Sequence, residues 1–473
     1  MVLAPDLAVH EVRRIKYPVT LRELPADLLT PVSAFLKIRV QGAAPFLMES
    51  ASGGERFSRF SILGMNPSGE IKAAAPGAAT WTRDGRALRG SLLDMLRSYV
   101  ADRSEAVPGL PFCGGLVGSV GFDFIHEIEA LPREQMSPEP MAWLGDYRTF
   151  IVFDHLKQVV QLVSRSEPGE AERELTELQQ ILEDECPARS QAHFEVGSRT
   201  SNFSRGEFCS AVERLKHHIQ IGDIFQAVLS QQFSRHFEGD PFQLYRALRR
   251  VNPSPYMFYH ETPVGTLIGA SPELLVGVEG RTARLLPIAG TRPRGVSETE
   301  DRAHERALLA DPKERAEHMM LVDLARNDLG RASENGSVKV DELAAIHRFS
   351  HVMHMVSRVS GRLRDHTTAI DALAASFPAG TVSGAPKVRA LELILEHEPT
   401  PRGMYSGASG FLGCDGSAEF CITIRTAVAH KGRLTYQAGA GIVADSVPER
   451  EYEETIHKAG AIERAIALAG GES

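Results

Sequence analysis

The sequence predicts an α/β protein in which strands and helices follow one another along most of the chain. Residues 1–165 hold short apolar runs separated by turn residues, a pattern typical of strands. Residues 166–200 are charged and then irregular, and from 201 to 473 strand-like and helix-like patterns intermix. We therefore expect a β-rich N-terminal portion, a linker and a larger C-terminal portion.

The β-rich portion is predicted from five segments, in which apolar runs are flanked by turn residues such as Gly, Asp and Ser. Asp84-Gly85 is a typical hairpin turn inside the third. The segments are PFLMES (45–50), RFSILG (59–64), TWTRDGRAL (80–88), FCGGLVGSVGFDF (112–124) and RTFIVFD (148–154).

The C-terminal portion is predicted to open with a helix. A capping box from Ser204 to Glu207 precedes apolar residues at helical spacing, namely Phe208, Val212, Leu215 and Ile219. Near the end of the chain, apolar and polar residues alternate in AEFCITIRTAV (418–428), so a strand there would turn Arg425 away from the core. RLTYQAGAGIV (433–443), after the Lys431-Gly432 turn, is predicted to be its partner strand.

Composition limits the classes of function. The chain has 473 residues, 43% of them hydrophobic, and a net charge of −9, which disfavours broad binding to nucleic acid or to an anionic membrane. We expect a small-molecule ligand. The five cysteines form no Cys-x-x-Cys pair, so neither a disulfide framework nor a zinc site is indicated. Neither a signal peptide nor a membrane-spanning run is recognisable, and the expected location is the cytoplasm.

Two Glu-x-x-Glu pairs, Glu314/Glu317 and Glu451/Glu454, each open a segment that is predicted to be a helix. Residues three apart share a helix face, so each pair can direct two carboxylates at one point. Four carboxylates brought together would repel one another unless a cation lay among them. The pattern therefore indicates a hard divalent metal, most plausibly Mg²⁺.

Glu314 also has a simpler interpretation, and a different metal site is an alternative for the pairs. Asp311-Pro312-Lys313-Glu314 has the form of an N-cap, a Pro at the first helical position and a capping Glu. A ferritin-like di-iron site would need a Glu-x-x-His from each of two helices, and only Glu454 with His457 fits.

An anion pocket is indicated by Arg425 beside Gly439-Ala440-Gly441, because a guanidinium matches a carboxylate and a stretch without bulky side chains can bring backbone N–H groups close to it. A surface ion pair and ordinary turn or bulge geometry explain the same residues equally well. The loop GTVSGAPK (380–387) lacks the spacing of a phosphate-binding P-loop, but its Pro386 suits the start of a helix, where anions are favoured.

His351 and His354 lie three residues apart. Two histidines without a third ligand are too few for a metal site, and a structural or proton-donating role is favoured.

The ordered motifs resemble the chorismate-utilising enzymes and, within them, the anthranilate synthase component I family. The resemblance covers the chain from about residue 40 onward. Its motifs are SPELL (271–275), PIAGTRPRG (287–295), AEHMMLVDLARNDLGR (316–331), HVMH (351–354), GTVSGAPKVRA (380–390), ITIRT (422–426), GAGIVADSVPEREYEET (439–455) and KA (458–459).

The resemblance implies two packed, mostly antiparallel sheets surrounded by helices, and a Mg²⁺-dependent reaction of chorismate. Glu317 and Glu454 would hold the metal, supported by Glu314 and Glu451, while Glu273 would protonate the departing hydroxyl from a water-poor pocket that raises its pKa. His354 would act in the later elimination of pyruvate. The implied substrate pocket consists of Gly290, Thr291, Thr381, Gly384, Tyr405, Arg425, Gly439, Ala440, Gly441 and Lys458.

Two positions distinguish among the related activities. Residue 226 is Gln, where isochorismate and salicylate synthases carry a Lys that activates water, and an amide cannot serve as that base. Residue 289 is Ala, where many aminodeoxychorismate synthases carry a nucleophilic Lys. Both favour direct attack by ammonia and hence anthranilate synthesis. Aminodeoxychorismate, isochorismate or salicylate synthesis and a non-catalytic binding role remain the alternatives.

The N-terminal portion resembles the tryptophan-binding region of feedback-inhibited members. LMES (47–50) and GGERFSRFSILG (53–64) supply one contact segment and NPSPYMF (252–258) the other, which implies a feedback site at Ser50, Pro255, Tyr256 and Met257. No glutaminase segment is recognisable. Ammonia is therefore expected from a separate glutamine amidotransferase subunit, in a hetero-oligomer, or from bulk ammonium.

Overall fold

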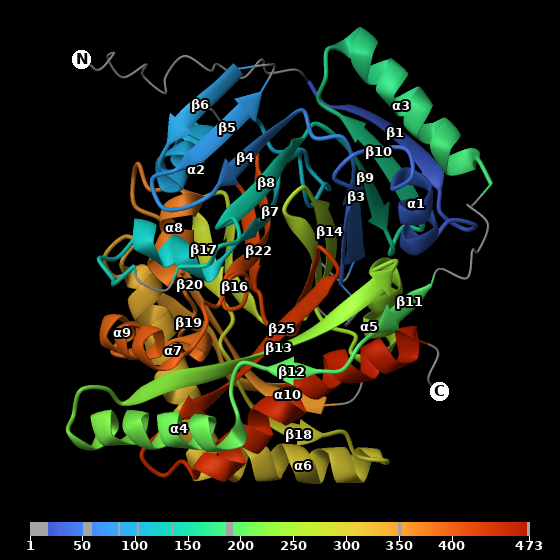
Figure 1. Cartoon of the computed structure of the whole chain (residues 1–473). Helices are drawn as coiled ribbons and strands as arrows, with labels where there is room; N and C mark the ends of the chain where they lie inside the picture. Colours follow the sequence, from blue (N-terminus) through green and yellow to red (C-terminus); the bar gives the residue numbers. More distant parts are fainter. Residues whose placement is uncertain are drawn as a thin grey trace, which may run out of the picture.

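Every strand pair in the described part of the chain is antiparallel, and the strands form two large sheets. The computed structural model describes residues 18–50, 59–83, 86–101, 104–133, 136–185, 193–348 and 352–470. Helices lie outside the two sheets (Figure 1). The predicted α/β fold with two packed, mostly antiparallel sheets is confirmed.

The first sheet joins strands from both ends of the chain. Its strands β12 (Thr200–Ser201) and β21 (Gly384–Ala385) pair with β13 beside the main path. Along that path the order is β1 (Thr20–Pro25), β10 (Val159–Ser164), β9 (Thr149–Asp154), β3 (Phe60–Gly64), β2 (Phe46–Glu49), β14 (Tyr256–Thr262), β15 (Gly265–Ser271), β24 (Thr426–His430), β25 (Arg433–Ile442), β13 (Gln226–Gly239) and β11 (Phe194–Val196).

The second sheet is built in the same way, with β19 (Lys339–Arg348) paired to β20 beside its main path. Its order is β18 (Ile288–Pro293), β20 (Val352–Arg362), β17 (Thr282–Leu285), β16 (Leu274–Glu279), β23 (Ala418–Ile422), β22 (Ala408–Gly413), β7 (Gly115–Val120), β8 (Ala142–Tyr147), β4 (Gly69–Ala73), β5 (Ala79–Arg83) and β6 (Arg86–Gly90).

Both sheets therefore cross the boundary that the sequence predicts at residues 166–200. That segment contains the predicted polar helix, but strands from 20–164 and from 226–442 share each sheet. The three predicted portions therefore differ in sequence pattern but do not form separate sheets. The regulatory role predicted for residues 1–165 stays a prediction. The five predicted N-terminal segments form strands β2, β3, β5 with β6, β7 and β9, and the Asp84-Gly85 turn lies outside the described residues.

The helices cover the outer faces of the sheets. Helices α4, α5 and α10 pack on the first sheet, and α2, α7 and α8 bury apolar side chains with strands of the second (Figure 1). None of the described helices is both long and apolar enough to cross a membrane. The helices are α1 (Pro31–Ile38), α2 (Leu92–Ala101), α3 (Pro168–Glu183), α4 (Arg205–Gln220), α5 (Phe242–Val251), α6 (Glu298–Ala310), α7 (Pro312–Gly330), α8 (Ala369–Ser376), α9 (Lys387–His397) and α10 (Pro448–Ala469), with 3₁₀ turns η3 (Phe122–Glu127) and η4 (Gly380–Val382).

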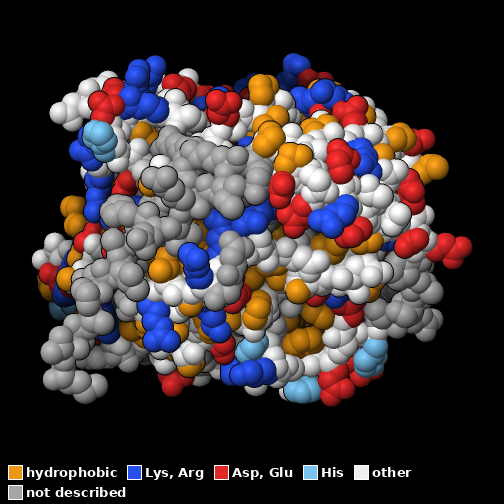
Figure 2. Space-filling view, turned by 90° about the horizontal axis from the view of Figure 1, so that it is seen from above, with side chains coloured by type: hydrophobic (Ala, Val, Ile, Leu, Met, Phe, Trp, Pro, Cys, Tyr) orange, Lys and Arg blue, Asp and Glu red, His pale blue; other side chains and the backbone are white. Residues whose placement is uncertain are grey.

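The predicted capping box opens α4. The Ser204 hydroxyl accepts from the Glu207 N–H at 3.3 Å, and the Glu207 carboxylate accepts from the Ser204 N–H at 2.8 Å. The surface carries both signs of charge, as expected from a chain with similar numbers of acidic and basic residues. On the face in Figure 2, acidic and basic side chains are interspersed, with small groups of hydrophobic side chains between them.

A buried ion pair connects the elements around the centre of the molecule. The Arg402 and Glu398 side chains are 1% and 3% exposed, and their charged atoms are 2.7 Å apart. Arg402 also donates to the backbone carbonyls of Val382 in η4 and Val228 in β13, at 2.7 and 2.8 Å. The Glu398 carboxylate accepts from the N–H and the hydroxyl of Ser230. The pair therefore fixes the loop that follows α8 against the first sheet.

We expect Arg402→Met to lower the free energy of unfolding by about 3–5 kcal/mol, because it leaves the Glu398 carboxylate buried without its cation. Urea unfolding followed by circular dichroism measures the change. The control is Arg22→Met, which breaks the ion pair with Glu172 at side chains that are 28% and 63% exposed and should cost less than about 1 kcal/mol. Equal costs for the two variants would contradict the central role of the buried pair.

Candidate functional site

Two chain crossings between the sheets create the centre of the candidate site. The chain passes from β15 to β16 through Glu273 and from β23 to β24 through Arg425. Three hydrogen bonds join the two crossings: Ser271 Oγ to Ile422 O at 2.6 Å, Ile422 N to Glu273 O at 3.0 Å, and Ala270 N to Arg425 O at 3.1 Å. Glu273 and Arg425 are thereby held beside each other.

Glu273 is a buried carboxyl group with a strongly shifted pKa. Its side chain accepts a hydrogen bond from Thr381 Oγ1 of η4 at 3.0 Å. Burial raises the pKa of Glu273 from 4.5 to about 7, although the Thr381 hydrogen bond and the charges of Arg425 and Lys458 act in the opposite direction. The expected water-poor environment is therefore present.

Arg425 does not continue the strand that the sequence predicts. Strand β23 ends at Ile422, and Arg425 has φ +50, in the left-handed region. The period-two pattern persists past the strand because the chain leaves one sheet and enters the other within three residues. Burial lowers the pKa of Arg425, and the Glu273 charge opposes that shift. The surface ion pair that the sequence allows for Arg425 is wrong.

Strand β25 contains Gly439, Ala440 and Gly441, paired with β13, so the turn or bulge interpretation of these glycines is also wrong. Because glycine has no side chain, Gly439 and Gly441 leave space beside β25 for a ligand. A Cβ on Gly439 would lie 2.8 Å from the Tyr405 hydroxyl, and one on Gly441 would lie 3.0 Å from the Gln226 amide nitrogen. The buried Ala440 side chain packs with the α4 core on the other face of the strand.

The loop that follows α8 lies against Gln226. Gly384 and Ala385 pair with the start of β13, and a Cβ on Gly384 would lie 2.2 Å from the Gln226 carbonyl oxygen. Pro386 is the N-cap of α9 rather than its first helical residue, because the helix begins at Lys387. The loop therefore closes one side of the site and carries Thr381 to Glu273.

His354 lies on β20 opposite Thr291 of β18. Its Nδ1 is 3.0 Å from the Gly290 carbonyl oxygen and 3.1 Å from the Thr291 hydroxyl. Because a carbonyl only accepts, Nδ1 carries the proton and Nε2 of the neutral ring is an acceptor. Burial lowers the pKa of His354, and nearby Arg425 lowers it further. His351 lies outside the described residues.

Gly290 is a bulge residue between two paired positions of β18 and β20, with φ +66. A Cβ there would lie 3.1 Å from a Glu314 carboxylate oxygen. The Glu314 carboxylate, on the first of the two glutamate helices, therefore lies close to β18, the strand paired with that of His354.

Both glutamate pairs open helices, as the sequence predicts. Asp311 caps α7 by accepting from the N–H groups of Lys313 and Glu314, with Pro312 first in the helix. The Glu314 carboxylate, however, accepts from Arg292 at 3.2 Å. Lys458 connects the second pair to the centre, with its Nζ 2.7 Å from the Glu454 carboxylate and 2.9 Å from the Gly439 carbonyl oxygen.

The carboxylates of α7 and α10 act on one another across the site. The Glu317 side chain keeps contact with solvent, yet partial burial of its carboxyl, followed by repulsion from Glu314 and then Glu454, raises its pKa. Partial burial raises the pKa of Glu451 too, and Glu454 adds to that shift. The two helices therefore present one electrostatically coupled acidic group.

This acidic group suits a hard cation that is shared with a ligand. Among the described residues, no three His, Cys, Asp or Glu side chains are already close enough together to hold a metal. Mg²⁺ does not require an all-protein cage, because it usually binds one or two carboxylates and completes its shell with water and substrate oxygens. Burial is the first cause of the raised pKa of Glu317 and repulsion from Glu314 and Glu454 adds to it, and a cation would relieve that repulsion.

The four residues expected to contact tryptophan lie on one part of the first sheet. Met257 of β14 pairs with Glu49 of β2, next to Ser50, while Tyr256 pairs with Ser271 of β15. Ser271 is the residue whose hydroxyl donates to Ile422 at the crossings. This segment is therefore connected to Glu273 through one strand pair. Residues 53–58, which belong to the N-terminal contact segment, lie outside the described residues.

Sequence reasoning missed the buried Arg402–Glu398 pair. The two residues are four apart and separated by Pro399-Thr400-Pro401, a stretch that looks like an exposed loop. The only available signal was the RGMYSG motif that places Arg402 three residues before Tyr405.

Comparison with known proteins agrees with this geometry. A family model described as chorismate binding enzyme matches residues 44–464. Anthranilate synthase component 1 of Acetivibrio thermocellus is 43% identical, with 96% of each chain covered, and that of Aquifex aeolicus is 40% identical, with 98% of each covered. The crystal structure of anthranilate synthase component I from Streptococcus pneumoniae superposes with a TM-score of 0.80 at 37% identity, over 93% of this chain and 98% of that one.

The chain belongs to the chorismate binding enzyme family. Within that family, its nearly full-length relatives at about 40% identity place it among the anthranilate synthase component I proteins. A menaquinone-specific isochorismate synthase from Escherichia coli shares the fold, with a TM-score of 0.71 at 19% identity.

The shifted pKa of Glu273 predicts a pH-dependent stability. A carboxyl whose pKa is about 7 in the folded protein and 4.5 in the unfolded chain favours folding most below about pH 4.5, and that contribution is lost as the pH rises to about 7. Glu273→Gln mimics the protonated form, so it should raise the free energy of unfolding by up to about 3 kcal/mol at about pH 8 and leave it unchanged at about pH 4.5.

Urea unfolding at the two pH values measures this difference. Glu213→Gln, at an α4 side chain that is 60% exposed, is the control and should show no such pH dependence. A Glu273→Gln effect of the same size at both pH values would contradict the assigned pKa.

Proposed function

We propose that the chain converts chorismate and ammonia to anthranilate, pyruvate and water in a Mg²⁺-dependent reaction, the first step of tryptophan biosynthesis. The supporting observation is Glu273, a buried carboxyl with a pKa of about 7 that lies between Thr381 and Arg425. It is an acid able to donate a proton at neutral pH beside cations able to hold a dicarboxylate.

Glu273 protonates the hydroxyl that leaves C4 of chorismate as water, while ammonia adds at C2. With a pKa of about 7, the protonated form of Glu273 is present at neutral pH and can supply this proton. The Thr381 hydroxyl, which donates to the same carboxylate, orients it and moderates the pKa. The resulting intermediate keeps its enolpyruvyl ether.

Arg425, Tyr405 and the backbone at Gly439 to Gly441 bind the carboxylate of that enolpyruvyl group. Arg425 is partly buried, and the nearby Glu273 carboxyl has a pKa raised to about 7, so it neutralises the guanidinium incompletely at neutral pH. An incoming carboxylate therefore pairs with it strongly. Strand β24 pairs with β25 only as far as Tyr436. Beyond Tyr436, every second N–H group of β25 points to the side where β24 no longer pairs, and these N–H groups can donate to a ligand.

His354 acts in the second half of the reaction, in which the C2 proton is removed and pyruvate leaves C3. Its Nδ1 proton is held by the Gly290 carbonyl, and the lowered pKa keeps the ring neutral. In this tautomer Nε2 is the ring nitrogen that would take a proton as the substrate ring becomes aromatic.

Glu317 and Glu454 would hold Mg²⁺, supported by Glu314 and Glu451, and Mg²⁺ would supply positive charge to the ring carboxylate of chorismate. Glu454 is paired with Lys458, whose ammonium also donates to the Gly439 carbonyl oxygen. Lys458 thus stands between the glutamates that would hold the metal and the pocket that would hold the substrate.

Ammonia as the nucleophile is supported by the two positions that distinguish related activities. Gln226 is 8% exposed and carries an amide where a base would be needed for water, and Ala289 is 8% exposed with no nucleophile to form an adduct. Aminodeoxychorismate synthesis is the second candidate, since it also uses ammonia.

We further infer feedback inhibition by tryptophan at Ser50, Pro255, Tyr256 and Met257, and a glutamine amidotransferase partner, component II, that supplies ammonia in the cytoplasm. The pairing of Tyr256 with Ser271 supports coupling of that site to Glu273. Residues 1–165 would then form a regulatory portion completed by a segment from the C-terminal portion.

The purified chain, given chorismate, Mg²⁺ and an ammonium salt, should release fluorescent anthranilate and equimolar pyruvate, and added tryptophan should lower the rate. Fluorescence and chromatography measure the products. Accumulation of 4-amino-4-deoxychorismate would assign the second candidate instead, and turnover without ammonium would indicate the use of water.

Glu317→Gln and Glu454→Gln should each raise the Mg²⁺ concentration needed for half-maximal rate by about tenfold or more, because each removes a carboxylate ligand. Magnesium titrations of the initial rate measure the shift. Glu453→Gln is the matched control on α10, at an exposed side chain that pairs with Arg205. A shift in the control as large as in the other two would contradict the metal assignment.

A further inference from the structure

The first glutamate of the α7 pair is already bound to an arginine of the second sheet. Arg292, on β18, donates to the Glu314 carboxylate at 3.2 Å and to the Asp311 carboxylate at 3.0 Å. Asp311 is also the N-cap of α7. One guanidinium therefore joins the strand to the start of the helix that carries Glu317.

Strand β18 directs Arg292 toward α7 and its neighbour Thr291 toward His354. The Thr291 hydroxyl contacts the His354 ring, and successive residues of a strand point to opposite sides, so the Arg292 side chain points to the side where α7 packs. Glu314 meets this strand with both carboxylate oxygens. Oε1 accepts from Arg292, and Oε2 lies 3.1 Å from where a Cβ on Gly290 would be.

Glu314 is nevertheless placed within reach of the proposed metal. It lies three residues before Glu317, so the two side chains share one face of α7. A different rotamer of Glu314 would bring its carboxylate toward a cation held at Glu317 and Glu454. The ion pair with Arg292 keeps the carboxylate turned toward β18 instead.

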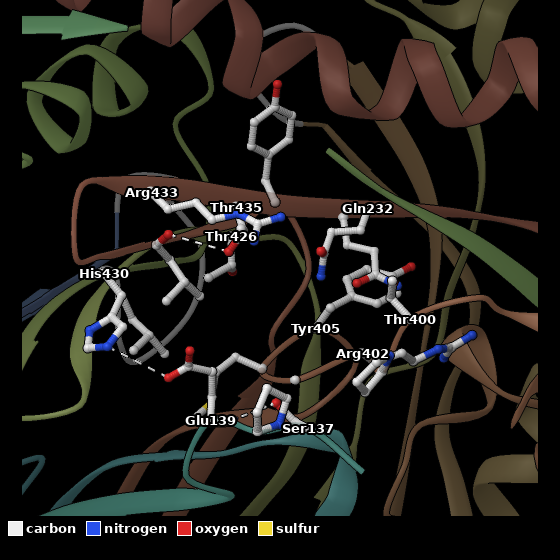
Figure 3. Close-up of a pocket in the computed structure, with 18 of the residues that line it drawn as sticks. Ser137, Glu139, Gln232, Thr400, Arg402, Tyr405, Thr426, His430, Arg433 and Thr435 are labelled. Carbon is white, nitrogen blue, oxygen red and sulfur yellow. Dashed lines mark hydrogen bonds and ion pairs between the residues drawn. The ribbon is translucent and has the colours of Figure 1, made fainter. Parts of the chain in front are cut away.

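The other arginine–glutamate pair of the site differs in its access to ions. Arg402 lies beside Tyr405 on the wall of a neighbouring cavity of about 300 Å³ (Figure 3), but its side chain and that of Glu398 are only 1% and 3% exposed. The Arg292 and Glu314 side chains are 29% and 24% exposed. Ions can therefore reach the Arg292 pair, and Glu314 can exchange its arginine for a metal.

Loss of the Arg292 charge would have two opposing effects on a metal at Glu317. The anchor between β18 and α7 would be lost, but ion pairs that are about a third exposed contribute little to stability. Helix α7 would keep its Asp311 cap and the buried side chains of Leu321 and Leu329. The second effect is electrostatic: a positive charge disappears beside a divalent cation and a carboxylate becomes free to bind it. The electrostatic effect should be the larger one.

We propose that Arg292 withholds Glu314 from Mg²⁺ and so keeps the metal affinity of the substrate-free protein low. The inference rests on the proposed function and adds Arg292 to its metal site as a positioning residue. Mg²⁺ that is held by few protein carboxylates completes its shell with other oxygens, including those of a substrate. Arg292 therefore leaves coordination positions for the carboxylate of chorismate, and metal and substrate strengthen each other's binding.

The test measures the Kd for Mg²⁺ of the full chain without chorismate, by isothermal titration calorimetry. Arg292→Met keeps a long side chain but removes the charge, and it should lower this Kd about fivefold because Glu314 becomes available. The double variant Arg292→Met with Glu314→Gln removes both charges of the pair. Its Kd should return to within about twofold of that of the unaltered chain.

A control and a second probe accompany this titration. Arg302→Met on α6 breaks a pair with Glu298 at side chains that are 67% and 68% exposed, and it should leave the Kd unchanged. Mn²⁺ also prefers oxygen ligands, and its paramagnetic resonance signal reports binding directly. The same order of affinities is expected for Mn²⁺.

An unchanged or higher Kd in Arg292→Met overturns the inference, because that result assigns Arg292 only to the anchoring of α7. A double variant that binds Mg²⁺ as tightly as Arg292→Met also overturns it, since Glu314 would then not be the ligand that is gained. These titrations require no turnover. If the affinities change as expected but the unaltered chain forms no anthranilate, the proposed function fails while the effect of Arg292 on the metal stands.

Discussion

The site depends on the hydrogen bonds that hold the two sheet crossings together. Ser271, Glu273 and Ile422 exchange bonds at the point where the chain leaves each sheet, and Ala270 bonds to Arg425. A strand that ended one residue earlier or later would turn either Glu273 or Arg425 to the opposite face. The register of two sheets built from distant segments therefore determines whether an acid and a cation meet.

Burial and charge oppose each other at this meeting point. Burial favours the neutral forms of both Glu273 and Arg425, while each charge favours the ionised form of the other. The balance leaves Glu273 with a pKa of about 7, and the neighbouring acidic helices leave Glu317 and Glu451 with raised pKa values. An anionic ligand at Arg425 together with a cation at the glutamates would relieve both conflicts.

The sequence predicts single elements well and their junctions poorly. The strands, the α4 capping box and the α7 cap form where local patterns place them, because those patterns depend on neighbours within a few residues. The strand through Arg425 is wrong because alternation continues across a change of sheet. The burial of the Arg402–Glu398 pair depends on Val228, Ser230 and Val382, which belong to other segments of the chain, so no local pattern contains it.

The same register argument explains how a distant ligand could act on the reaction. Tyr256 lies directly opposite Ser271, and Ser271 in turn bonds to Ile422, three residues before Arg425. A ligand that binds one arrangement of β2 and β14 more tightly would bias β15, and with it the position of Glu273 relative to Arg425. Coupling of this kind is reciprocal, so a ligand that pairs with Arg425 must weaken the binding of an inhibitor that displaces it. The short route through a single strand pair makes the crossing at residues 271–273 the element on which both ligands would act.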